Sequence, residues 1–250
     1  MTQLQFSFRE ILDEVDAMSK VAEPFIAPGS VNVLPDLREA LRSFQSVATE
    51  TGRTWGILET RPLLTQHSDG EYEAGRRKGS LRVYAEITSV WGIAQVREKI
   101  GKKARADRFA LTGKTSTRVR IHSAADSAEI AMWRMEIGDS ESPGCHFHVQ
   151  VRGELDDIPF PKALSVPRLP SLHTSPLCVL EFVLSELFQR RWDERVAEEA
   201  RHLERWAPIQ RQRFSRILAW QIKTLRERAI GSPWVALKRE KPEPDLFVKE

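Results

Sequence analysis

The middle of the sequence alternates between apolar and polar residues, and this alternation constrains the fold more than any other feature. The alternating runs cover residues 81–88, 118–122, 131–137 and 145–152. Because successive side chains of a strand point to opposite faces of a sheet, each run predicts a strand with one apolar and one polar face. Short connections between the last three runs favour neighbouring antiparallel strands. We therefore expect a central four- to five-stranded, mainly antiparallel sheet with one apolar face.

Helical periodicity precedes this sheet. Residues 8–22 repeat apolar side chains at helical spacing and follow a capping box formed by Ser7 and Glu10. A second periodic segment follows Pro35 and ends near Gly52. The sequence therefore predicts two N-terminal helices.

A proline-rich connection and further helices follow the sheet. Five prolines between residues 158 and 176 exclude a regular helix or a central strand. Ser175 and Pro176 then supply an N-cap and a first helical residue. We expect this helix to cover the apolar face of the sheet with Leu177, Leu180, Leu184, Leu187, Phe188 and Trp192. Another helix follows Pro208, and we predict that its apolar side consists of Phe214, Ile217, Leu218, Ile222 and Leu225.

These elements predict an α+β fold in which N-terminal helices, a central sheet and C-terminal helices form one domain over residues 1–240. The N-terminal helical part covers residues 1–60, the sheet 80–153 and the C-terminal helices, packed on one sheet face, 175–230. A length of 250 residues suits one large domain or two small ones. We expect residues 241–250 to form a mobile tail, although its apolar residues could dock against the body.

Composition excludes several classes of protein. Hydrophobic residues make up 41% of the chain and charged residues 29%, which is typical of a globular protein and not of a disordered one. No apolar run approaches the 18 residues of a membrane span, and the N-terminus lacks a signal-peptide pattern. Cys145 and Cys178 match no metal-binding or redox spacing. We therefore expect a cytoplasmic protein with reduced thiols, no cofactor, no metal and no membrane partner.

Two histidines form the most suggestive local motif. A strand at this point would place His146 and His148 on the polar face, about 7 Å apart. Histidine titrates near neutral pH and suits general base catalysis, so these two are the candidate catalytic residues if the protein is an enzyme. Arg118, Arg120 or Arg152 would then hold an anionic, phosphate-type substrate. The same arginines would repel a bare metal cation, which disfavours a metal site.

Cations are concentrated near the centre of the chain. Residues 97–120 carry nine lysines and arginines but only two acidic residues. Several such cations together give salt-dependent binding to a phosphate backbone. The residues that we predict to bind nucleic acid or another anion are Lys99, Lys102, Lys103, Arg105, Arg108, Arg118, Arg120 and Arg152.

Two other motifs have simpler explanations. Residues 113–115 resemble the end of a phosphate-binding loop, but Arg108 stands where the earlier glycine is required, and a strand follows instead of a helix. We therefore predict a turn there. His173 lies close to Ser175, but helix capping already accounts for this serine, and no G-x-S-x-G motif surrounds it.

The leading hypothesis is a non-enzymatic cytoplasmic binding component. Its basic patch would contact a nucleic-acid backbone or an acidic protein partner, as a subunit of a larger assembly. One alternative is a hydrolase that acts on an anionic, phosphate-type substrate around His146 and His148. Another is a structural module that forms homo-oligomers through an apolar stripe on the C-terminal helices. The sequence leaves open whether the protein is an enzyme.

Overall fold

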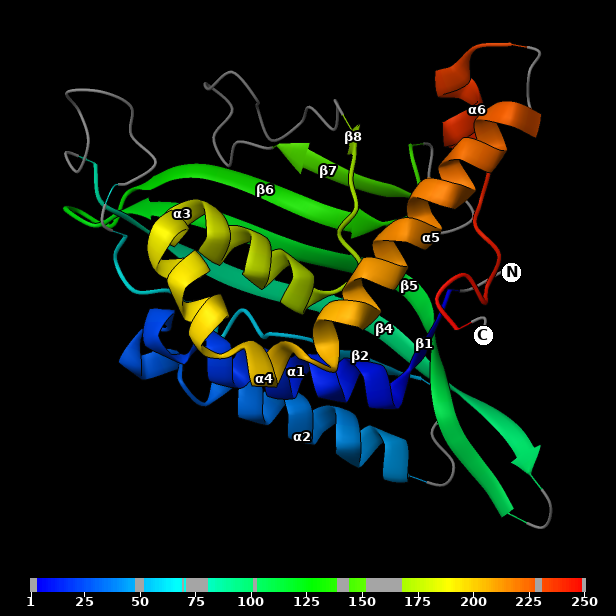
Figure 1. Cartoon of the computed structure of the whole chain (residues 1–250), viewed down its shortest axis with the longest axis horizontal. Helices are drawn as coiled ribbons and strands as arrows, with labels where there is room; N and C mark the ends of the chain where they lie inside the picture. The colour runs from blue at the N-terminus through cyan, green and yellow to red at the C-terminus, as the bar shows by residue number, and fades with distance from the viewer. Residues whose placement is uncertain are drawn as a thin grey trace.

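The protein has an α+β fold in which helices pack against one face of a large antiparallel sheet (Figure 1). The computed structural model describes residues 4–47, 52–68, 70, 81–100, 103–138, 144–151, 168–227 and 231–248. At residues 97–100, 103–106 and 114 this description covers the backbone alone.

The N-terminal region contains a short strand and the two expected helices. Its elements are β1 (Gln5–Ser7), α1 (Phe8–Val21), the 3-10 turns η1 (Glu23–Phe25) and η2 (Pro28–Ser30), and α2 (Val33–Ser46). The Ser7 hydroxyl accepts a hydrogen bond from the Glu10 backbone N–H at 3.5 Å, as the capping box predicts. The second helix ends at Ser46, earlier than the expected end near Gly52.

The sheet of the described chain has eight strands, more than the four or five that we expected. The other strands are β2 (Arg53–Trp55), β3 (Leu63–Leu64), β4 (Val83–Ile100), β5 (Lys103–Ser123), β6 (Glu129–Ile137), β7 (Phe147–Val151) and β8 (Arg168–Pro170). The main order is β2-β4-β5-β6-β7-β8, with β1 paired to β5 and β3 paired to β4. The four additional strands have only two or three residues each, too few to produce a recognisable alternation.

Strands β4 and β5 form one long hairpin, whereas the alternation predicted two shorter strands, at residues 81–88 and 118–122. The pairing continues to Ile100 and Lys103, and its register is interrupted by a bulge near Gly92 and again between Val96 and Glu98. A Cβ at Gly92 would lie 1.8 Å from the Thr112 carbonyl oxygen, so this close approach requires glycine. Gly113, at φ +64°, belongs to the same bulge. The turn predicted at residues 113–115 is therefore a bulge within a continuous strand.

Helices cover the apolar face of this sheet. Helix α3 (Pro176–Glu198) contacts β4, and α1 and α2 contact β5. The expected apolar stripe of α3 is buried, from Leu177 to Trp192. It packs with the sheet residues Val83, Ala85, Ile87 and Val119 in one hydrophobic core. Each such side chain stabilises the fold by roughly 1.5–3 kcal/mol relative to its exposed state.

Helix α5 presents a different face to the core from the one that we predicted. The remaining helices are α4 (Ala200–Leu203), α5 (Trp206–Glu227) and α6 (Pro233–Arg239). Ile217 is buried, but the exposed fractions of Leu218, Ile222 and Leu225 are 45%, 50% and 39%. The buried residues of α5 are Trp206, Gln210, Arg213, Ile217 and Thr224. The prediction for the three leucine and isoleucine positions is therefore wrong, because polar side chains occupy most of the buried stripe.

The C-terminal segment packs against the body as far as Val248. Phe247 is 1% exposed, and its ring centroid lies 5.1 Å from that of Phe6 and 5.9 Å from that of Phe147. The Gln5 N–H donates a hydrogen bond to the Pro244 carbonyl at 2.8 Å. These contacts replace the mobile tail that we expected at residues 241–250, of which the structure describes all but the last two.

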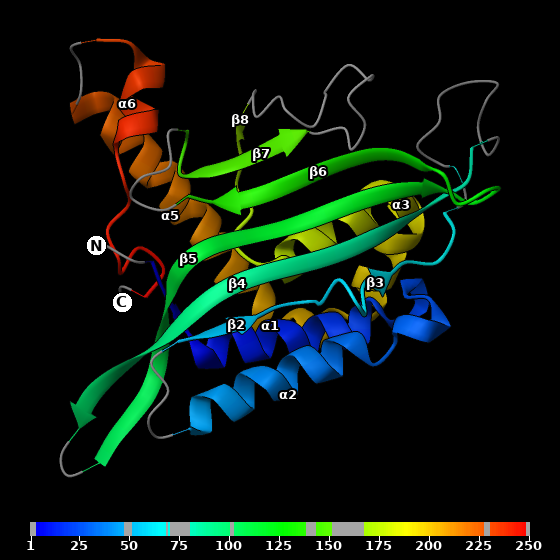
Figure 2. The same cartoon turned by 180° about the vertical axis from the view of Figure 1, so that it is seen from behind.

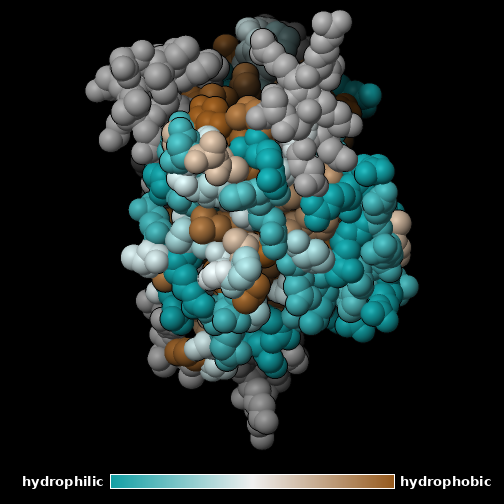
Figure 3. Space-filling model, turned by 90° about the vertical axis from the view of Figure 1, so that its left-hand side faces the viewer, coloured by the Kyte–Doolittle hydropathy of each residue, from teal (hydrophilic) through white to brown (hydrophobic). Residues whose placement is uncertain are grey.

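The outer surface is mainly hydrophilic on the side that Figure 3 draws, where hydrophobic residues gather toward the upper end. Within the described ranges, no helix combines the length and apolarity that crossing a bilayer requires.

Candidate functional site

The polar face of the sheet is the first candidate site, because no helix of the described chain covers it (Figure 2). The register brings together side chains that are far apart in the sequence. Thr88 pairs with Arg118, Arg118 with Arg134, and Arg134 with Gln150. One row of this face thus carries two arginines from neighbouring strands, as the alternation predicts.

Carboxylates accompany the arginines of this face. Arg118 Nη2 lies 2.6 Å from Glu59 Oε1. Arg120 contacts Glu86 at 2.8 Å and Glu129 at 3.3 Å. An anionic substrate would have to displace these carboxylates from the two predicted anion-binding residues. The pairing therefore weakens the argument for an anion site on this part of the sheet.

The two candidate catalytic histidines do not lie side by side on this face. His148 occupies β7 opposite Glu136, and its Nε2 lies 3.2 Å from Glu136 Oε2. His146 precedes β7, and its ring packs edge-on against Phe147 and against Trp220 of α5, with centroids 5.0 Å and 6.4 Å away. The expectation of neighbouring imidazoles is wrong because the strand alternation begins only at Phe147.

The surroundings of His148 do not favour a general base. Its Nδ1 lies 2.8 Å from the Cys145 carbonyl oxygen, so both ring nitrogens face hydrogen-bond acceptors. His148 is also only 2% exposed, so a substrate would have little access to either nitrogen. A third imidazole, His122, lies 3.6 Å from Glu86 and belongs to a different row of the face. The hydrolase hypothesis therefore stays a prediction to which this geometry adds little.

The end of the β4–β5 hairpin is the second candidate site. We call residues 97–100 and 103–107 the arm, because they lie past the Val96–Arg108 pair, where β1 makes its last contact with β5 at Ser7. No other described strand pairs with the arm, and Figures 1 and 2 show it extending away from the helices. Its base, Arg108, is half-buried.

Three of the predicted binding residues lie in the arm. Lys99 pairs with Ala104 and Lys103 with Ile100, while Arg105 pairs with Glu98. Their side chains are outside the described part of the structure, as are Lys102 and Arg152 entirely. The structure thus places Lys99, Lys103 and Arg105 in one two-stranded ribbon and leaves the other two positions untested.

A buried ionic cluster, which the sequence did not predict, connects α1, α3 and α5. Arg213 is 1% exposed, and it contacts Glu14 at 3.0 Å and Glu10 at 3.1 Å. The Ser175 hydroxyl donates to Glu14 at 2.6 Å and accepts from the Cys178 backbone N–H at 3.0 Å. Ser175 is therefore the N-cap that we predicted, and its hydroxyl is committed to structural contacts. One sequence signal was present: Glu14 occupies the same helical stripe as its apolar neighbours.

The two buried cysteines and the partly buried His173 have altered acidity. Burial raises the pKa of Cys178 to about 12, and it raises the pKa of Cys145 above its ordinary value. Both thiols are therefore poor nucleophiles at neutral pH. Burial lowers the pKa of His173 to about 4.

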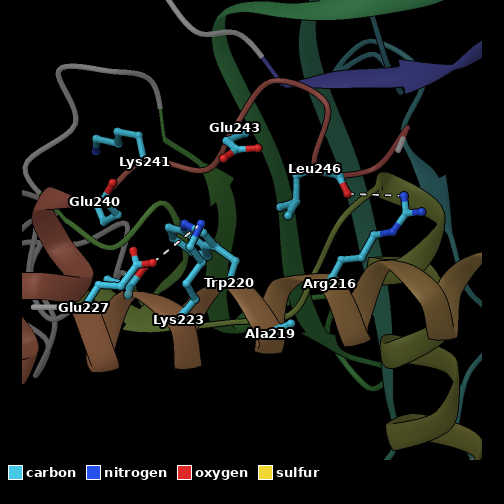
Figure 4. A pocket seen from close by; sticks show the side chains of 10 residues that line it. Arg216, Ala219, Trp220, Lys223, Glu227, Glu240, Lys241, Glu243 and Leu246 are labelled. Atoms are coloured by element: carbon cyan, nitrogen blue, oxygen red, sulfur yellow. Dashed lines mark hydrogen bonds and ion pairs between the residues drawn. The ribbon is translucent and has the colours of Figure 1, made fainter. Parts of the chain in front are cut away.

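A cleft of about 320 Å³ separates α5 from residues 240–246 (Figure 4). Trp220 contributes to its wall, and Arg216 donates a hydrogen bond to the Leu246 carbonyl at 3.3 Å. Lys223 forms an ion pair with Glu227 at 3.8 Å. Charges of both signs line the cleft, so it has no evident preference for an anion.

Within the described residues, no cluster of three or more histidine, cysteine or acidic side chains is suited to a metal ion. Comparisons with protein-family models, with curated proteins and with solved structures gave no significant match. The function is therefore inferred from the geometry and the charge of the chain itself.

Proposed function

We propose that the protein is a non-enzymatic binding component whose arm contacts a nucleic-acid backbone. One observation carries the proposal: β4 and β5 continue as a two-stranded ribbon past the last neighbouring strand, in the most cationic part of the sequence. Residues 97–108 hold six lysines and arginines and two acidic residues.

The dimensions of the arm support this proposal. A two-stranded ribbon fits the major groove of B-form DNA, which is about 12 Å wide and 8.5 Å deep. Four residues of β4 follow Val96, and at about 3.3 Å per residue they extend roughly 13 Å. The arm is therefore long enough to reach the floor of such a groove.

The charge of the arm suggests contact with phosphates more than recognition of sequence. Each lysine or arginine that neutralises a phosphate adds to the affinity and to its salt dependence, whatever the bases are. An acidic protein surface would also attract these cations. The ribbon shape favours nucleic acid, because a groove of matching size is a general property of the duplex.

The test is a binding titration against labelled duplex DNA and RNA at salt concentrations from about 50 to 200 mM. The triple variant Lys99→Glu, Lys103→Glu, Arg105→Glu should lower the affinity at least tenfold, about equally for all sequences, and reduce the salt slope by about 3. The matched control reverses three exposed helix cations, Arg190, Arg205 and Arg226, and changes the net charge equally. We expect the control to change the affinity less than threefold.

Two outcomes would contradict the proposal. The first is no binding of any DNA or RNA at about 50 mM salt. The second is an equal loss of affinity in the arm variant and the helix control, which would indicate a general charge effect without a defined site.

A second candidate function, self-association, rests on the exposed stripe of α5. Leu218, Ile222 and Leu225 lie at helical spacing and are each more than one-third exposed. Contiguous apolar surface of this kind often marks a protein contact. Light scattering should show a dimer that the variant Leu218→Glu, Ile222→Glu converts to a monomer, and a wild-type monomer would contradict this function.

A further inference from the structure

A cavity of about 610 Å³ lies between α3, α4 and α5. It exists because α3 bends at Gln189, whose φ of 32° and ψ of −106° are not helical. Glu181 before the bend and Val196 after it therefore line the same cavity. In Figure 1 the yellow ribbon of α3 changes direction before it meets α4. The volume lies within the range of small-molecule sites, roughly 300–1,000 Å³.

Apolar side chains form most of the wall of this cavity. Val196, Leu203, Trp206 and Phe214 contribute to it from three helices. Two charged residues, Glu204 and Arg211, also border it, but both are exposed to solvent. A ligand inside would therefore contact mainly hydrocarbon and aromatic surface.

Glu181 and Gln210 provide a polar end to the cavity. Gln210 Nε2 donates a hydrogen bond to Glu181 Oε2 at 2.7 Å. Gln210 is 5% exposed, and its Oε1 has no hydrogen-bond partner within the described structure. The Glu181 carboxylate, which is only partly buried, is therefore the acceptor that this end offers to a donor in the cavity.

The carboxyl group of Glu181 favours a cation over an anion. Burial raises the pKa of Glu181 to about 7, with a smaller contribution from the Glu14 carboxylate of α1. Arg213 of α5 does not line the cavity, and it is already paired with Glu14 and Glu10. An anionic ligand at this end would therefore meet the Glu181 carboxyl group without Arg213 as its counter-ion.

We propose that this cavity binds a primary amine with an apolar body. The ammonium would donate a hydrogen bond to the Glu181 carboxylate beside Gln210, while the apolar body packs against Trp206 and Phe214. This site is independent of the arm, so the two proposals can fail separately.

The test uses n-hexylamine, with n-hexanol and hexanoate as neutral and anionic controls, in an NMR titration of the full chain. Hexylamine should shift the Trp206 indole resonance saturably, and both controls should bind at least tenfold more weakly. Glu181→Gln preserves size and should lower the amine affinity at least tenfold. Glu204→Gln, at the exposed border, should change it less than twofold.

The pH dependence of binding gives a second readout. With a Glu181 pKa of about 7, the ionised fraction rises about tenfold between pH 6 and pH 8, while the amine stays charged. The affinity of the wild type should therefore rise about tenfold over this range, and that of Glu181→Gln should stay constant. The other groups that face this end, Glu14, Arg213 and Arg211, are present in both proteins.

Three results would overturn the amine site. They are hexanoate binding as tightly as hexylamine, full affinity in Glu181→Gln, and saturable shifts that leave Trp206 unchanged. If Glu181→Gln lost its native spectrum, Glu181→Asp would serve instead, because it keeps the carboxylate and should retain the pH dependence with weaker binding.

Discussion

The two ends of the β4–β5 hairpin differ in how their charges relate to the fold. Near Glu86 and Arg120 the hairpin has neighbouring strands on both sides, helices on one face and ion pairs on the other. In the arm the same two strands continue without a further described strand, and cations outnumber acids. The described ion pairs lie in the body, whereas the arm is the part of the hairpin where the sequence supplies an excess of cations. This difference is why we propose binding for the arm.

The largest expected effect belongs to the body, at its buried ionic cluster. Arg213→Met should lower the free energy of unfolding by about 3–5 kcal/mol, because it leaves the fully buried Glu14 without a cation. Urea denaturation measures this change. The double variant Glu14→Gln, Arg213→Met should recover about 1–3 kcal/mol of the loss. A single-variant cost below about 1 kcal/mol would contradict a structural role for the pair.

A smaller effect should appear at His173 when the pH falls. Its pKa is about 4 in the folded protein and about 6.5 when unfolded, so only the unfolded state gains a proton between these values. Stability is fully present above pH 6.5 and should fall by about 3 kcal/mol as the pH decreases toward 4. His173→Gln should lack this component. Parallel stability–pH curves for the two proteins would show that burial of this ring is unimportant.

A substitution on the polar face of the sheet should change the free energy of unfolding less. Glu86→Gln removes one partner of Arg120, but Glu129 remains 3.3 Å from the guanidinium. We expect a loss of about 0.5–1 kcal/mol in the free energy of unfolding, since partly exposed ion pairs contribute little. Thermal unfolding of the variant, compared with Glu59→Gln at the exposed Arg118 pair, measures it. A loss above 2 kcal/mol would place this face in the same class as the buried cluster.

The arm should give the smallest effect on stability. Reversal of Lys99, Lys103 and Arg105 should change the free energy of unfolding by less than about 0.5 kcal/mol, as is usual for substitutions away from a packed core. Urea denaturation of the same variant used for binding measures it. A cost above 1 kcal/mol would mean that arm and body form one cooperative unit. The charges of the arm would then contribute to stability as those of the body do.

The sequence predicts the body of the fold well because its signals are local. The alternation at Val83, Ala85 and Ile87 reports directly which face is buried, and all three residues are buried in the structure. The predicted run ended at residue 88, whereas β4 continues to Ile100, with Trp91 and Ile93 buried in the same phase. His146 was assigned to the wrong surroundings for a related reason, since a pattern cannot show where a strand begins.

The sequence predicts contacts between distant residues poorly. Arg213 and Glu14 are 199 positions apart, and no local pattern links them. Without that link, the apolar residues Leu218 and Ile222 appeared to be the natural buried side of α5. The buried ionic cluster decides which face of α5 is turned to the interior, because a paired arginine is stable there. The apolar stripe of α5 is left on the outside.

The C-terminal segment has a consequence for how the protein is made. Phe247 packs on Phe6, so β1 cannot complete its packing until a residue far along the chain has left the ribosome. Folding of this part cannot finish before residue 247 has been made, and Phe6, which is fully buried in the final structure, needs protection until then. A nascent chain stalled before residue 247 should therefore be more sensitive to proteases, and more readily held by chaperones, than the released protein.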